Sequence, residues 1–66
     1  MGSLGEEYPL EQNRCRELLE VYKSIGQPGW FGHAMIGQVL ERADKAAMSG
    51  DVVAMLNSFE EMKGCE

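Results

Sequence analysis

The 66-residue chain has few of the residue types from which catalytic and metal sites are built. Its two cysteines, Cys15 and Cys65, lie far apart and form no CxxC pattern, so the sequence indicates neither a zinc site nor a redox motif. Its single histidine, His33, has no nucleophile, orienting carboxylate or second ligand at a recognisable spacing. We therefore expect a protein that is not an enzyme and that needs no metal or cofactor.

Basic residues are also scarce, because six lysines and arginines stand against eleven aspartates and glutamates, which gives a formal net charge of −5. Binding of DNA or RNA depends on dense basic patches, and no apolar run approaches the roughly 20 residues of a membrane span. Neither a nucleic acid polymer nor a membrane is therefore an expected partner. Without a secretory signal, we expect a cytoplasmic protein with free thiols, and a Cys15–Cys65 disulfide is the minor alternative.

What the sequence does contain is helical periodicity in three segments. In the first, apolar residues recur at helical spacing up to Ile25, and Pro9 suits the first turn, so we expect a helix over residues 9–25. Gly26 is expected to end this helix in the left-handed conformation. Residues 1–8, which contain glycines and glutamates, are expected to form a flexible acidic tail.

The second and third segments are expected to form an antiparallel helical hairpin. The second helix is expected to begin near Gly32 or His33 and to end at Ser49–Gly50. The third follows at once, because Asp51 is a good N-cap, and so short a connection favours antiparallel neighbours. The expected fold class is therefore all-α, a small three-helix bundle in which residues 9–66 form a single domain.

Five methionines give this bundle a soft and adaptable apolar surface. A chain of this size buries only about 60% of the surface that its unfolded form exposes, so its own core is small. Association of several copies is the simplest way to cover the remaining apolar surface. We therefore expect a homo-oligomer.

The most distinctive segment is the glycine-rich turn of residues 24–33, SIGQPGWFGH. A turn needs glycine and proline, but it does not need Trp30 beside Phe31. Exposed rings stack on nucleobases, and a helix N-terminus with a glycine backbone offers N–H groups to a phosphate. The alternative is structural, with both rings plugging the open end of the bundle. Under the binding hypothesis the stacking rings are Trp30, Phe31 and Tyr22, and the phosphate ligands are Gly29, Gly32, His33, Lys23 and Arg14.

Several segments carry a resemblance to a known group of proteins. They are residues 18–26 (LLEVYKSIG), residues 29–32 (GWFG) with Met35 and Ile36 after them, and residues 49–56 (SGDVVAML). In these segments the chain resembles small helical proteins encoded by phages and prophages. Some small helical phage proteins are oligomeric sponges that sequester cyclic nucleotide signals of antiphage defence. The resemblance carries no catalytic motif and implies a binding role, in the host cytoplasm if the chain is phage-encoded.

The expected function is therefore sequestration of a small anionic nucleotide, such as a cyclic oligonucleotide, which blocks host antiphage defence. The alternative is a protein-interaction adaptor or inhibitor that docks a methionine- and aromatic-rich surface onto a host protein. Cations gathered around Trp30 at a concave subunit boundary favour the nucleotide. An apolar patch rimmed by acidic residues favours the protein partner.

Overall fold

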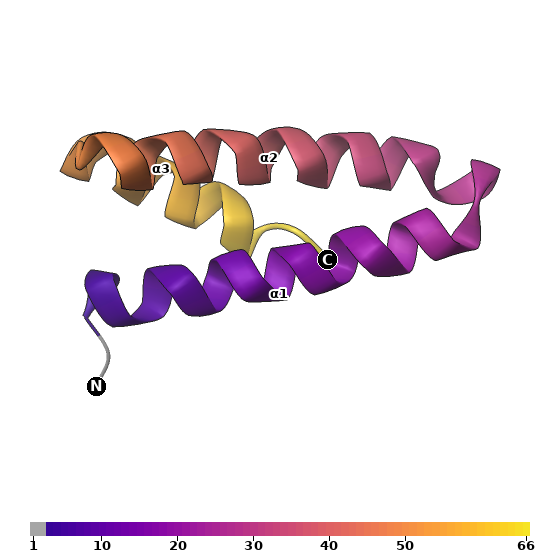
Figure 1. Cartoon of the computed structure of the whole chain (residues 1–66), viewed down its shortest axis with the longest axis horizontal. Helices are drawn as coiled ribbons and strands as arrows, with labels where there is room; N and C mark the ends of the chain where they lie inside the picture. Colours follow the sequence, from indigo (N-terminus) through magenta and orange to yellow (C-terminus); the bar gives the residue numbers. More distant parts are fainter. Residues whose placement is uncertain (1–2) are drawn as a thin grey trace.

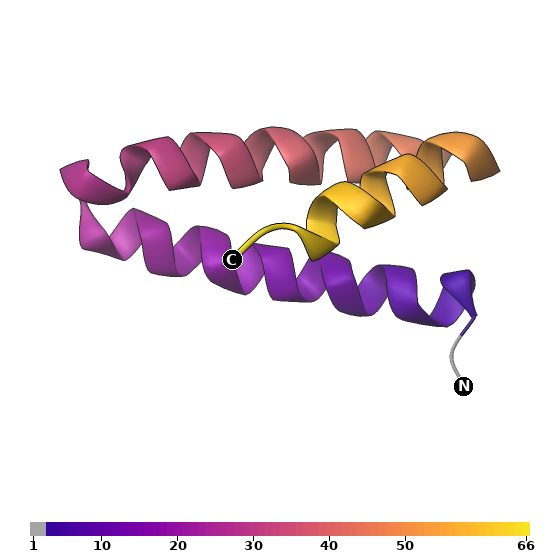
Figure 2. The same ribbon diagram turned by 180° about the vertical axis from the view of Figure 1, so that it is seen from behind.

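The computed structural model describes residues 3–66, and within them three α-helices form the bundle. Helices α1 and α2 run antiparallel along the long axis, and α3 folds back from the far end of α2 to finish over the middle of α1 (Figures 1 and 2). The all-α three-helix bundle expected from the sequence is confirmed. The bounds are Leu4–Ile25 for α1, Gln27–Gly29 for the short 3-10 helix η1, Trp30–Ser49 for α2 and Val52–Lys63 for α3.

The ends of the helices follow the capping residues in the sequence. Gly26 and Gly50 end α1 and α2 with φ angles of 86° and 70°, a region that favours glycine. Gly50 is left-handed, whereas the ψ angle of −144° at Gly26 lies outside the left-handed helical region that we expected. The Asp51 carboxylate accepts a hydrogen bond from the Ala54 N–H at 3.2 Å, as expected of the N-cap of α3. Helix α2 begins at Trp30, two residues earlier than expected, because η1 leads directly into it.

Helix α1 begins at Leu4, so the expected tail is wrong for residues 4–8; residues 1 and 2 lie outside the described residues. The Ser3 hydroxyl accepts a hydrogen bond from the Glu6 N–H at 3.3 Å and caps the helix. Ser3 and Glu6 have the spacing of a capping box, a signal that our interpretation of the sequence overlooked. Pro9 therefore lies inside α1 rather than in its first turn.

Tyr8 holds this early part of α1 against both other helices. Its side chain is 2% exposed, and its hydroxyl donates to the Ala43 carbonyl oxygen of α2 at 2.8 Å. The same hydroxyl shares a 2.7 Å hydrogen bond with the Ser58 hydroxyl of α3. The Tyr8 ring stacks on Phe59, with ring centroids 6.2 Å apart. One side chain thus connects all three helices.

The rest of the core is narrow and comes mainly from α2. Its buried apolar residues are Cys15, Ile36, Val39, Leu40, Ala43, Ala46 and Met62. Several apolar residues that the periodicity assigns to the same stripes are instead about half or more exposed, among them Ile25, Met35 and Leu56. None of the described helices is both long and apolar enough to cross a membrane.

We predict that Tyr8→Phe lowers the free energy of unfolding by about 1–2 kcal/mol, because the buried Ala43 carbonyl and Ser58 hydroxyl each lose a partner. Urea unfolding followed by circular dichroism measures this loss. The matched control is Tyr22→Phe, which removes a hydroxyl that is bonded at the exposed chain terminus. Equal stability of Tyr8→Phe and the wild-type protein would contradict this role of Tyr8.

Candidate functional site

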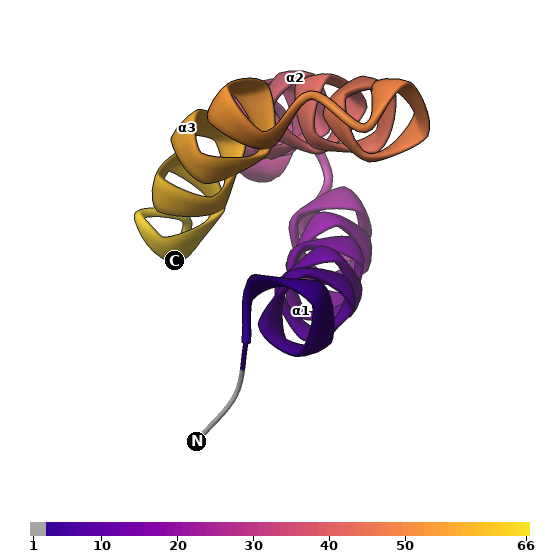
Figure 3. The same ribbon diagram turned by 90° about the vertical axis from the view of Figure 1, so that its left-hand side faces the viewer.

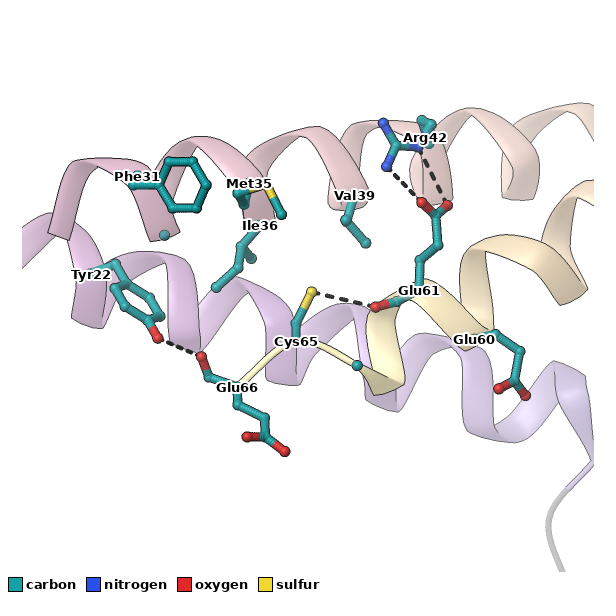
Figure 4. Close-up of a pocket in the computed structure, with 12 residues that line it drawn as sticks. Tyr22, Phe31, Met35, Ile36, Val39, Arg42, Glu60, Glu61, Cys65 and Glu66 are labelled. Atoms are coloured by element: carbon teal, nitrogen blue, oxygen red, sulfur yellow. Dashed lines mark hydrogen bonds and ion pairs between the residues drawn. The ribbon is translucent and has the colours of Figure 1, made fainter.

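A groove lies beside the part of α2 that α3 does not reach. Helix α2 has 20 residues and α3 has 12, and the difference of eight residues corresponds to roughly 12 Å of helix. The groove has a volume of about 500 Å³ (Figure 4). It is lined by Tyr22, Phe31, Gly32, Met35, Ile36, Val39, Arg42, Glu60, Glu61, Gly64, Cys65 and Glu66.

The wall that α2 contributes to this groove is apolar. Phe31 and Met35 lie one helical turn apart, and Phe31 is 78% exposed. Ile36 and Val39 are buried and form the base. This wall offers the contact area of a hydrophobic binding site that no part of the described chain covers.

The C-terminal segment closes the opposite side of the groove. It runs from the end of α3 toward α1, where the Tyr22 hydroxyl donates to the backbone oxygen of Glu66 (Figure 4). The Cys65 thiol donates weakly to the Glu61 carbonyl oxygen at 3.5 Å. These contacts place Glu66 and Cys65 at the groove.

The charges on the groove are mainly negative. Glu60, Glu61 and Glu66 line it against the single guanidinium of Arg42, so three negative charges and one positive charge give a net −2. Arg42 is already paired with Glu61, at 2.7 Å between Nη2 and Oε2. That hydrogen bond raises the pKa of Arg42, so the guanidinium stays charged and paired with Glu61. An anionic ligand in this groove would face uncompensated carboxylates.

Trp30 and Phe31 do not plug the bundle, because the two side chains are 64% and 78% exposed. Successive residues of an α-helix point about 100° apart. Phe31 accordingly lines the groove together with Tyr22, whereas Trp30 does not line it. The two adjacent rings therefore lie on different flanks of α2.

The two glycines of the expected phosphate site serve the packing of α1 against α2. A β-carbon at Gly29 would lie 2.3 Å from the Tyr22 carbonyl oxygen, and one at Gly32 would lie 2.7 Å from the Tyr22 ring. The Gly29 N–H donates to the Gly26 carbonyl at 2.9 Å, and the Trp30 N–H donates to the Gln27 carbonyl. These two N–H groups are therefore already bonded within the turn.

The basic residue Arg14 of the expected site does not lie with the rings. It is paired with Glu11 at 3.0 Å, and its guanidinium donates to the backbone carbonyls of Met62 and Cys65 at the end of α3. The hydrogen bond with Glu11 raises the pKa of Arg14. Arg14 thus caps α3, where a positive charge complements the helix dipole. Lys23 lies in the last turn of α1, at the same end of the bundle as Trp30.

Three further cations are also bound to acidic residues, whereas the Lys63 ammonium lies over the Phe59 ring, 5.5 Å from its centroid. A second hollow, of about 460 Å³ between α2 and α3, contains Arg42 and Lys45. Lys45 pairs with Glu41 at 3.3 Å, and on another face Arg16 pairs with Asp44 at 3.0 Å. Within residues 3–66, no group of three or more histidine, cysteine or acidic side chains is arranged to hold a metal ion.

The acidic side of the groove was missed at the sequence level. From the sequence we assigned no role in binding to Glu60, Glu61 or Glu66. The signal that was available is helix length, because Asp51 and Gly64 bracket only 12 residues, fewer than the 17 of the helix expected over residues 9–25. A short third helix leaves part of the α1–α2 pair uncovered.

Comparison of the chain with protein-family models, with curated proteins and with solved structures finds no match. The resemblance to phage-encoded proteins therefore stays a prediction. The function has to be argued from the groove and the surfaces around it.

The two thiols beside the groove differ in character. Cys15 is fully buried and Cys65 is partly exposed, and both are free. Burial, together with the neighbouring Cys65, raises the pKa of Cys15 from 9.0 to about 11. The buried thiol is therefore a poor nucleophile at neutral pH.

We predict that the wild-type protein loses stability between pH 9 and pH 11 through Cys15. In this range the unfolded chain releases the thiol proton while the folded chain keeps it, so the unfolded state gains free energy of ionisation. Between pH 8 and pH 10.5 the free energy of unfolding should fall by about 2 kcal/mol more in the wild-type protein than in Cys15→Ala. Urea titrations under reducing conditions measure the difference. The same pH dependence in both proteins would contradict the raised pKa.

Proposed function

We propose that the protein is a non-catalytic interaction module that docks its groove onto a segment of another protein. The observation that carries the proposal is an apolar wall, with Phe31 and Met35 exposed, in a groove whose lining also includes Glu60, Glu61 and Glu66. Exposed apolar surface rimmed by polar groups marks interaction sites. This is the adaptor or inhibitor that the sequence offered as the alternative function.

The charge of the groove favours one kind of partner segment. A net charge of −2 on the lining, in a chain of net charge −5, attracts lysine and arginine side chains and repels phosphates. The apolar wall requires aliphatic or aromatic residues on the same segment. We therefore propose a basic amphipathic helix as the bound element, because helices lay apolar faces into hydrophobic grooves.

The length of the uncovered part of α2 sets the size of this segment. Eight residues beyond the reach of α3 correspond to about two helical turns. A helix of two to three turns would therefore fill the position that a longer α3 would take. Its basic residues would lie toward Glu60, Glu61 and Glu66.

Nucleotide sequestration is the second candidate function. The observation in its favour is that Trp30 is exposed and that His33, three residues later, lies on the same face of α2. Lys23, in the last turn of α1, lies at the same end of the bundle. One ring, one imidazole and one ammonium group would hold a cyclic oligonucleotide, on the flank of α2 away from Phe31.

Self-association is part of the proposal, as the sequence led us to expect. Among the described residues, ten large hydrophobic side chains are between 49% and 89% exposed. So much apolar surface on a 7.3 kDa protein favours assembly with further copies.

The groove is tested with a fluorescein-labelled amphipathic peptide of about 11 residues, or three helical turns, made of leucine and lysine. We predict that the anisotropy of this peptide rises on addition of the protein, that Phe31→Ser weakens the binding at least tenfold, and that added salt weakens it as well. The matched peptide of leucine and glutamate should not bind. Val53→Glu, which lies outside the groove, is the control variant.

Two results would overturn the docking proposal. One is equal binding of the lysine and glutamate peptides, or equal binding by the wild-type protein and Phe31→Ser. The other is a response to cyclic di- and trinucleotides, followed by native mass spectrometry, that Trp30→Ala abolishes while helix content stays intact. The second result would support nucleotide sequestration as the function, in place of docking onto a protein.

A further inference from the structure

A second apolar surface lies at the opposite end of the bundle from the η1 turn. It surrounds the turn between α2 and α3, which faces the viewer in Figure 3. We call it the corner patch, and it consists of Met48, Val52, Val53 and Leu56. Met48 is 89% exposed, and the other three are about half or more exposed. None of the four lines the groove.

The patch follows from the register of α3. Met62 and Ser58 are buried, and Met55 and Phe59 pack against the core. Val52, Val53 and Leu56 lie beside this buried face and within about 100° of one another. With Ser58 and Met62 at the centre of the buried face, these three side chains stay exposed.

The charge around the patch favours a second copy of the chain. Residues 46–59 contain one charged side chain, Asp51, in a chain that has 17. Two copies of net charge −5 repel each other, and two grooves facing each other would bring together two linings of −2 each. Glu60 is the next acidic side chain on this face, one helical turn after Leu56, and Lys63 follows it, so Asp51, Glu60 and Lys63 sum to −1 and the corner patch presents less like charge than the groove does.

An antiparallel pairing of two α3 helices also brings opposite charges together. Position 57, beside Leu56, is midway between Asp51 and Lys63. A two-fold axis at this point places Lys63 of one copy near Asp51 of the second copy, twice by symmetry. Val52, Val53 and Leu56 of both copies then fill the space between these ends.

We propose that two copies of the chain associate through the corner patch and leave both grooves open. The inference rests on the proposed self-association and names its surface. The dimer is expected to be weak, because four side chains and one face of a 12-residue helix are less than the roughly 800 Å² per partner of a standard interface.

Sedimentation velocity from about 10 µM to 500 µM tests the proposal, and we expect a dissociation constant of about 100 µM for so small an interface, so that the dimer appears within this range. Val53→Glu should raise the dissociation constant at least tenfold. It should keep the fold, because a glutamate in the first turn of α3 complements the helix dipole. Lys63→Glu should weaken the dimer, because it replaces an attraction to Asp51 of the second copy by a repulsion. Circular dichroism confirms folding of each variant.

The control variant is Phe31→Ser in the groove, which should dimerise like the wild-type protein. A wild-type protein that stays monomeric at every concentration would overturn self-association as a whole. A dimer that Phe31→Ser weakens and Val53→Glu does not would overturn the corner patch alone, because the copies would then meet at the groove. The first result leaves the proposed peptide binding untouched, because the groove of a monomer stays open. In the second result the second copy would compete with the basic peptide for the groove.

Discussion

The three-helix arrangement depends on the contacts of one buried tyrosine. The hydroxyl of Tyr8 bonds to Ala43 on α2 and to Ser58 on α3, and its ring lies on Phe59. A buried hydroxyl without partners costs free energy, so these bonds fix which parts of the helices meet. They bring α3 to the N-terminal part of α1. With 12 residues, α3 then ends before it reaches the η1 turn.

The open end of the bundle is a consequence of this placement. There α1 and α2 pack directly on each other, and Gly29 and Gly32 allow the backbone and ring of Tyr22 to approach closely. With no third helix on this side, Phe31 and Met35 stay exposed. The C-terminal segment reaches partway across, through the contact of Glu66 with Tyr22. The groove is thus the unfilled part of an otherwise regular three-helix packing.

The sequence predicted the fold class, the end of α2 and the start of α3 correctly, because local capping determines these two boundaries. Gly50 and Asp51 act within one helical turn, and such signals are visible in a single chain. The start of α1 was predicted wrongly because Pro9 outweighed the capping box of Ser3. What holds Pro9 inside the helix is the burial of the neighbouring Tyr8, a tertiary contact with partners 35 and 50 residues away.

The candidate site was harder to predict for a related reason. Aromatic rings and glycines are visible in a sequence. Whether a ring or a backbone N–H group is free to bind a ligand depends on what packs against it. Gly32 lies against Tyr22, and Arg14 caps α3, so both are occupied by the fold. Adjacent positions in the chain also do not imply a shared site on a helix. Trp30 and Phe31 point to different flanks of α2, because the helix already begins at Trp30. We had expected the helix to begin after both residues, and a turn before the helix would not separate the two rings in this way.

The distribution of charge connects the two proposed surfaces. A net charge of −5 acts at a distance on anything that approaches the protein, and it disfavours both a second copy and a phosphate. A basic segment gains from this field wherever carboxylates border an apolar wall, as Glu60, Glu61 and Glu66 do at the groove. An identical copy can associate only where its own charge is sparse, as it is around Val52 and Val53. The same excess of acidic residues therefore underlies both proposals, because it favours a basic segment at one end of the bundle and leaves only the charge-poor end to a second copy.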